Sequence, residues 1–156
     1  MISFKQLSSC VGLSVDSPEV VNLFSTCMKN SVVTFDNTFG KTYTCHDAGC
    51  EVHCNKRPER ISSIHLYGDV LVGEDEKTFS RYDNELPFSI SFDDTPNTVQ
   101  QKLGEPVASG SDKMPKAPSP HLPPSFDWLR YQHEGAIVRF CFIKTPNPKL
   151  FRIDLQ

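Results

Sequence analysis

One short pattern occurs twice in the chain and limits its fold more than any other feature. Residues 16–21 and 94–99 share the order Asp, Ser or Thr, Pro, any two residues, Val. Ser and Thr are favoured at helix N-caps and Pro at the first helical position, so each copy predicts a helix start. Because strand-like segments in a similar order follow each copy, we expect a pseudo-repeat of two helix-plus-sheet units.

The predicted helices are short. Apolar residues at helical spacing predict a helix over residues 18–29, and a shorter helix is expected over about residues 4–10. In the second half, Thr95 begins a helix of about two turns, which Gly104 and Pro106 bring to an end.

Segments rich in β-branched and aromatic residues, separated by turn residues, predict the strands. They are residues 32–35, 41–45, 50–54 and 60–67 in the first half, and residues 126–131, 136–144 and 150–155 in the second. We therefore predict an α+β fold in which two tandem antiparallel sheets join into one continuous sheet with helices on one face. The units are expected at residues 1–69 and 86–156, with a connector at residues 70–85.

Prolines are concentrated in one segment of the second unit. Five of the twelve fall between Pro115 and Pro124. Proline donates no backbone hydrogen bond, so residues 115–124 are expected to form an extended surface loop. Recognition of this loop by a partner is the alternative.

Charge and hydropathy exclude two kinds of partner. The 156 residues include 16 Lys and Arg against 19 Asp and Glu, a formal net charge of −3. This charge has the wrong sign to neutralise phosphates, so we expect no nucleic acid partner. No stretch approaches the ~20 apolar residues that span a bilayer, and residues 1–7 lack the pattern of a signal peptide. We therefore expect a cytoplasmic protein with no membrane partner.

The six cysteines are expected to be reduced thiols, because disulfides are rare in the cytoplasm. The segment from Cys45 to Cys54 contains three cysteines and two histidines, which are zinc ligands. However, no second cluster completes a zinc site, and strand alternation puts Glu51 and His53 on the face opposite Cys54. We therefore expect an ordinary hairpin with no metal and no cofactor. A zinc-binding module or small metal-dependent enzyme built on this segment is the alternative.

Motifs typical of enzymes do not occur. The sequence contains no GxSxG elbow, no glycine-rich phosphate loop and no HExxH pair. We therefore expect a protein that is not an enzyme, with no catalytic residues.

Binding residues are instead expected on a sheet face that helices leave free. Aromatic and arginine side chains dominate protein-binding hot spots. Strand alternation indicates a set of such residues for this face, although alternation leaves open whether Trp128 or Leu129 points inward. The expected partner-binding residues are His65, Tyr67, Trp128, Arg130 and Arg152, with Glu74, Asp75 and Glu76 of the connector as an acidic rim.

Three segments carry a resemblance to known proteins: residues 60–68, residues 85–92 and residues 99–106. Together they resemble small bacterial immunity proteins of polymorphic toxin systems. The last segment is also similar to the repeated helix-plus-sheet unit of β-lactamase inhibitory protein and related small outer-membrane lipoproteins. Residues 1–7 show no lipobox or signal-peptide pattern, so we do not expect the lipoprotein role.

The resemblance implies a non-enzymatic protein that binds and neutralises a protein toxin, and it transfers no binding residues. We expect an immunity or inhibitor protein that occludes its cognate toxin over a standard interface of ~800 Å² per partner. An adaptor or chaperone for a secreted effector is a further alternative.

Overall fold

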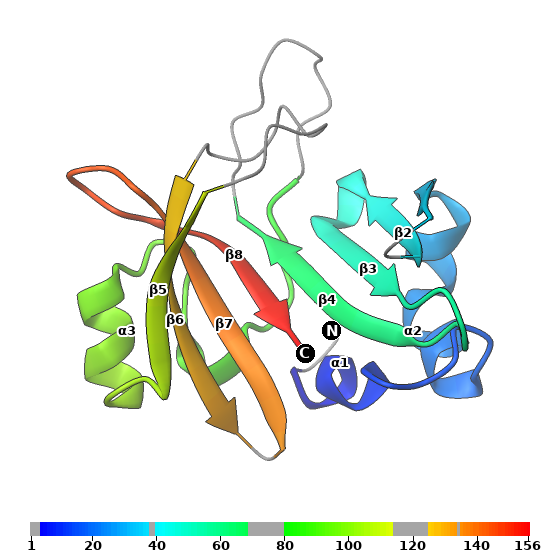
Figure 1. Ribbon diagram of the computed structural model, residues 1–156, viewed down its shortest axis with the longest axis horizontal. Helices are drawn as coiled ribbons and strands as arrows, with labels where there is room; N and C mark the ends of the chain where they lie inside the picture. The colour runs from blue at the N-terminus through cyan, green and yellow to red at the C-terminus, as the bar shows by residue number, and fades with distance from the viewer. Residues whose placement is uncertain (1–3, 38–39, 69–79, 114–124, 134) are drawn as a thin grey trace, which may run out of the picture.

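The computed structural model describes residues 4–37, 40–68, 80–113, 125–133 and 135–156, which form an α+β fold (Figure 1). Eight antiparallel strands make one sheet, in the order β1-β2-β3-β4-β8-β7-β6-β5. The strands are β1 Val32–Asp36, β2 Gly40–Cys45, β3 Cys50–Cys54, β4 Ile61–Tyr67, β5 Ala108–Lys113, β6 Ser125–His133, β7 Ala136–Ile143 and β8 Leu150–Leu155. The helices are α1 Phe4–Cys10, α2 Pro18–Lys29 and α3 Pro96–Leu103, with 3-10 turns η1 His46–Ala48 and η2 Pro87–Ser89.

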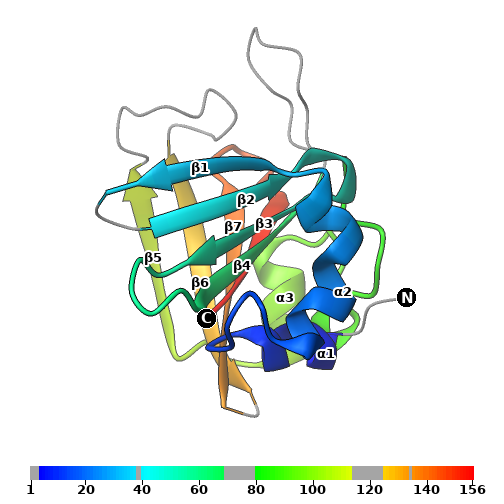
Figure 2. The same cartoon turned by 90° about the vertical axis from the view of Figure 1, so that its right-hand side faces the viewer.

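The two halves of the chain meet at one pair of strands. β1 to β4 pair in sequence order, β5 to β8 do the same, and β4 pairs with β8 across the junction. In Figure 2 the strands of the first half run across the direction of β5, β6 and β7, which is the strong twist expected of a long antiparallel sheet. One continuous antiparallel sheet is therefore confirmed.

The helices begin as the repeated pattern predicts. α3 opens with a capping box, in which the Thr95 hydroxyl accepts from the Thr98 N–H and the Thr98 hydroxyl accepts from the Thr95 N–H. Pro96 lies in the first turn of α3, and Pro18 in that of α2. Ser17 occupies the N-cap of α2, but its hydroxyl makes no capping hydrogen bond with the described residues. None of the helices in the described part of the chain is long and apolar enough to cross a membrane.

Two apolar clusters pack against the sheet. The larger cluster contains side chains of all three helices and of strands from both halves, among them Val52, Ile64, Val138 and Ile153. The smaller cluster consists of Tyr67, Phe126, Cys141 and Phe151. Since neighbouring residues of a strand point to opposite faces, Leu66 in the larger cluster places the adjacent Tyr67 on the other face of the sheet.

Strand β5 was not predicted from the sequence. Its residues, Ala-Ser-Gly-Ser-Asp-Lys, include no β-branched or aromatic side chain. The strand forms because it pairs with β6 over its full length, and Gly110 lies under the Trp128 indole, where a Cβ would come within 2.7 Å of the ring. Tertiary packing therefore overrides local preference here.

Two predicted segments fall largely or wholly outside the described residues. The proline-rich loop at residues 115–124 lies outside them, as does the connector up to residue 79. The last connector residues are described, and they pack on the first half, where the Tyr82 N–H donates to the Tyr67 carbonyl and the Ser80 N–H to the His46 carbonyl.

The shared sheet predicts that the two halves unfold together. Ile153 is fully buried and lies between Leu66 of β4 and Phe140 of β7. We expect Ile153→Ala to lower the free energy of unfolding by about 2–5 kcal/mol, because it leaves a cavity at the junction. Urea titrations followed by far-UV circular dichroism and by fluorescence of the single tryptophan, Trp128 in the second half, should give one coincident transition. Two separate transitions would contradict a shared core.

Candidate functional site

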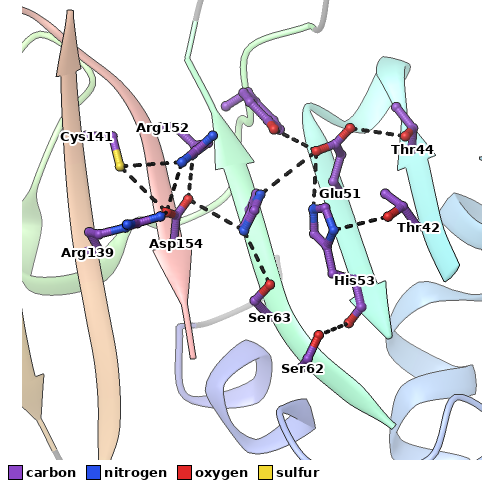
Figure 3. Close-up of polar contacts among 12 residues, drawn as sticks. Thr42, Thr44, Glu51, His53, Ser62, Ser63, Arg139, Cys141, Arg152 and Asp154 are labelled. Carbon is purple, nitrogen blue, oxygen red and sulfur yellow. Dashed lines mark hydrogen bonds and ion pairs between the residues drawn. The ribbon is translucent and has the colours of Figure 1, made fainter. Parts of the chain in front are cut away.

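The sheet face opposite the larger apolar cluster carries a network of polar and charged side chains, and we call it the open face. Figure 3 shows most of its side chains pointing toward one another from neighbouring strands. The alternation of the strands explains their position, since Val52, Ile64 and Ile153 point into the larger cluster. The network comprises Thr42, Thr44, Glu51, His53, Ser63, His65, Tyr67, Asp112, Arg139, Cys141, Arg152 and Asp154.

A fully buried carboxylate, that of Asp154, lies at the centre of the network. Arg139 contacts Asp154 Oδ2 through Nε at 2.9 Å and Nη2 at 2.7 Å. Arg152 contacts Oδ1 through Nε at 2.6 Å and donates to Oδ2 through Nη2 at 3.1 Å. Burial alone would raise the pKa of Asp154, but His65, Arg152 and Arg139 hold it below its usual range. The carboxylate therefore remains ionised at neutral pH.

The smaller apolar cluster supports the two arginines. The Arg152 guanidinium lies 5.2 Å from the centre of the Phe126 ring and 5.7 Å from that of Phe151. The Arg139 guanidinium lies 5.9 Å from the Trp128 ring. Aromatic faces attract cations, so these rings fix the positions of the charges that hold Asp154.

A second carboxylate, that of Glu51, lies on β3. The Thr44 hydroxyl donates to Oε1 at 3.1 Å, and the Tyr67 hydroxyl donates to Oε2 at 2.7 Å. His53 Nε2 lies 3.4 Å from Oε2, and His65 Nδ1 lies 3.9 Å from it. Burial alone would raise the pKa of Glu51, but the contacts with His53 and Tyr67 and the charge interactions with both histidines lower it to about 2.

The two histidine rings lie side by side with their centres 4.2 Å apart, and His65 lies between the two carboxylates. His53 Nδ1 is 3.1 Å from the Thr42 hydroxyl. His65 Nε2 is 3.3 Å from the Ser63 hydroxyl and 3.8 Å from Asp154 Oδ1. Burial lowers the pKa of His65 to about 3, so its imidazole is neutral at neutral pH.

The structure places several of the predicted binding residues on the open face, with different exposures. Tyr67 and Arg152 are buried, with 1% and 5% exposed area, so they position Glu51 and Asp154 and offer little contact area to a partner. His65 is partly buried within the network, and Arg130 is exposed. This corrects the expectation that alternation alone would leave Tyr67 and Arg152 accessible.

Trp128 and Arg130 share the open face, because Leu129 between them points into the larger cluster. Trp128 is half-buried and packs against the smaller cluster. The predicted acidic rim of Glu74, Asp75 and Glu76 lies outside the described residues.

Sequence reasoning missed Glu51, His53, Arg139 and Asp154 as members of the site. Glu51 and His53 were correctly expected on one face of their strand. Their proximity to His65 depends on the β3–β4 register, in which Glu51 pairs with His65, and a single sequence does not show that register. One sequence signal could have indicated them. Glu51 and His53 are two residues apart in a predicted strand, as are Arg152 and Asp154, and residues at this spacing share a face.

The expectation of six reduced cysteines is wrong for two of them. A disulfide joins Cys27 of α2 to Cys45 of β2, with their Cα atoms 5.6 Å apart. Sequence spacing did not indicate it because it depends on how α2 packs on the sheet. The pair also occupies Cys45, a ligand of the alternative zinc module. The remaining cysteines are free and buried: Cys10, Cys50, Cys54 and Cys141.

Comparison with known proteins gave no match. No family model, no curated protein and no solved structure matches the chain. The functional argument therefore depends on the residues and geometry of the open face.

The disulfide predicts a defined thiol count and a loss of stability when it is removed. We expect thiol titration of the unfolded protein to give four free thiols without reductant and six with it. The bond closes a loop between residues 18 apart in sequence. Replacing both Cys27 and Cys45 by Ser should therefore lower the free energy of unfolding by about 3 kcal/mol, measured by urea denaturation. Six free thiols in the unreduced protein would show that the bond does not form.

The buried ion pairs predict a large effect of neutralising Asp154. We expect Asp154→Asn to lower the free energy of unfolding by about 3–5 kcal/mol, because it leaves the buried Arg152 without its counter-charge. Asp93→Asn is the matched control, since Asp93 is an exposed partner of Arg81 and such pairs contribute about 0–1 kcal/mol. Equal effects of the two substitutions in urea denaturation would contradict a central role for Asp154.

Proposed function

We propose that the chain is an immunity or inhibitor protein that binds a cognate protein toxin through the open face of its sheet and occludes it. The observation that carries this proposal is the exposed Arg130 and the half-buried Trp128, which lie beside a fixed network of charges on that face. Glu51, Asp154 and the two arginines that hold Asp154 are positioned by neighbouring side chains before any partner arrives. Side chains that are held in place before binding lose little conformational entropy when a partner binds, which favours a tight complex.

Exposed groups beside the network supply the direct contact in this proposal. Arg130 is exposed and Trp128 half-buried on the same face, and both are residue types common in binding hot spots. The Arg139 and Arg152 charges are offset by Asp154 and Asp112. Among the described residues of the open face beside them, Arg130 is an exposed cation. We infer that Arg130 contacts an acidic group of the toxin.

We further propose that the two halves are tandem copies with their helices on one face, as expected from the repeated pattern. Two facts support this: each half follows a helix opened by Pro18 or Pro96, and all three helices contribute to the larger cluster. The strand order is also the same in each half: counted outward from the β4–β8 junction, it is β4-β3-β2-β1 on one side and β8-β7-β6-β5 on the other. The check is to superpose residues 16–67 on residues 94–155. If Pro18 and Pro96 then lie at unrelated positions, the two halves are not copies.

The test of the binding face is a charge reversal at Arg130. We expect Arg130→Glu to weaken binding to the toxin encoded by the neighbouring gene by about 30-fold, the effect of losing a hot spot worth ~2 kcal/mol. Cells that carry this variant should lose protection from the toxin. Binding is measured by titration calorimetry and folding by circular dichroism.

Lys113→Glu is the matched control, because it makes the same change in charge on the neighbouring strand β5. Lys113 follows Asp112, which faces Arg139, so alternation places the lysine on the opposite face of the sheet. Full protection by a folded Arg130→Glu variant would exclude this part of the open face. Binding without any protection would instead favour the adaptor or chaperone alternative.

A further inference from the structure

We propose that Glu51, His53 and His65 form a binding site for a divalent transition-metal ion, with Zn²⁺ as the best fit, on the open face of the sheet. This inference goes beyond the proposed inhibitor function and does not depend on it. It shares only His53 with the zinc module considered for Cys45 to Cys54 and uses no cysteine, because Glu51 and His53 point to the face opposite Cys50 and Cys54.

The first argument is the convergence of three ligand atoms. Glu51 and His53 point the same way from β3, and His65 is the partner of Glu51 in the paired strand β4. Each of the three side chains offers one ligand atom within 4.8 Å of the other two. From Glu51 Oε2, His53 Nε2 lies at 3.4 Å and His65 Nδ1 at 3.9 Å. Tetrahedral zinc with bonds of ~2.0–2.1 Å holds its ligand atoms about 3.3 Å apart. The closest pair, His53 Nε2 and Glu51 Oε2, is already at 3.4 Å, so modest side-chain rotations complete the geometry.

The second argument is where the remaining imidazole nitrogens point. His53 Nδ1 faces the Thr42 hydroxyl at 3.1 Å, and His65 Nε2 faces the Ser63 hydroxyl at 3.3 Å and the Asp154 carboxylate at 3.8 Å. Metal-binding histidines characteristically donate their outer N–H to a carboxylate, a carbonyl or water, which fixes the ring and turns the other nitrogen to the metal. The Thr42 and Ser63 hydroxyls and the Asp154 carboxylate lie where such acceptors are needed.

This assignment brings electron-rich atoms together. With the protons on the outer nitrogens, the lone pairs of His53 Nε2 and His65 Nδ1 both face the Glu51 carboxylate. His53 Nε2 is also buried and makes no hydrogen bond with the described residues. A cation placed between these atoms is attracted by the Glu51 carboxylate and accepts the lone pairs of both imidazoles. The Glu51 carboxylate is held for this role by hydrogen bonds from Thr44 and Tyr67.

The types of ligand indicate which ion binds, and the exposure of the side chains shows that the ion can reach them. Two imidazoles and one carboxylate suit zinc and neighbouring transition metals better than Mg²⁺ or Ca²⁺, which prefer oxygen ligands. The side chains of Glu51, His53 and His65 are 18%, 30% and 15% exposed, so an ion can reach them from solvent. Three protein ligands leave a fourth position of the tetrahedron for water.

The experiment uses the full chain with its disulfide intact, stripped of metal by a chelator and titrated with ZnCl₂ in a calorimeter. We expect one Zn²⁺ per chain, and at least a tenfold loss of affinity in each of Glu51→Gln, His53→Gln and His65→Gln. Co²⁺ should bind the same site and show the visible absorption of a four-coordinate ion. His133→Gln is the control for general histidine binding, and Cys50→Ser is the control for thiolate binding; both should bind zinc as the parent does.

Thr42→Val tests the outer contact without touching a ligand. It removes the hydroxyl that faces His53 Nδ1, and we expect zinc affinity to fall about 10-fold, at the low end of the range for such outer partners. A folded parent protein that binds no zinc, or ligand variants that bind it as tightly as the parent, would overturn the proposal. If one ligand variant fails to fold, the other two decide the outcome. Protection from the toxin is measured separately, so loss of the metal site leaves the test of the inhibitor function unaffected.

Discussion

The charge on Asp154 is the constraint on which the junction of the sheet depends. A fully buried carboxylate is tolerated only when counter-charges and hydrogen bonds compensate for its lost hydration. Here Arg139 comes from β7 and Arg152 from β8 itself, and β4 supplies His65 beside them. A shift of β8 by one residue would turn Asp154 toward the larger apolar cluster, so the charge fixes the register that joins the two halves.

Local pattern was sufficient for most of the fold. The strands β3 and β8 and the helix α2 agree with the sequence predictions residue for residue, because alternation, capping and turn residues all favoured the same element there. β5 was missed because its sequence has low strand propensity and is stabilised by β6. Local preference does not reveal a strand whose stability comes from its neighbour.

The contacts within the site were harder to predict from the sequence than the strands and helices. Alternation correctly assigned His65 and Arg152 to the open face, but it gives the face of a residue and not its neighbours on other strands. The contact of Glu51 with His65 follows from strand register, and the Cys27–Cys45 bond from the packing of α2 on β2. Both are long-range properties, which a single sequence without covarying relatives does not carry.

The position of β8 has a consequence for how the chain assembles. β8 follows all the other described strands in the chain, yet it lies between β4 and β7 in the sheet. During synthesis, both flanking strands therefore exist before the strand that separates them, and each has an unpaired edge that other strands can join. Direct pairing of β4 with β7 would leave Arg139 without the carboxylate of Asp154. The Asp154–Arg139 ion pair therefore favours the sheet with β8 in place over direct pairing of β4 with β7.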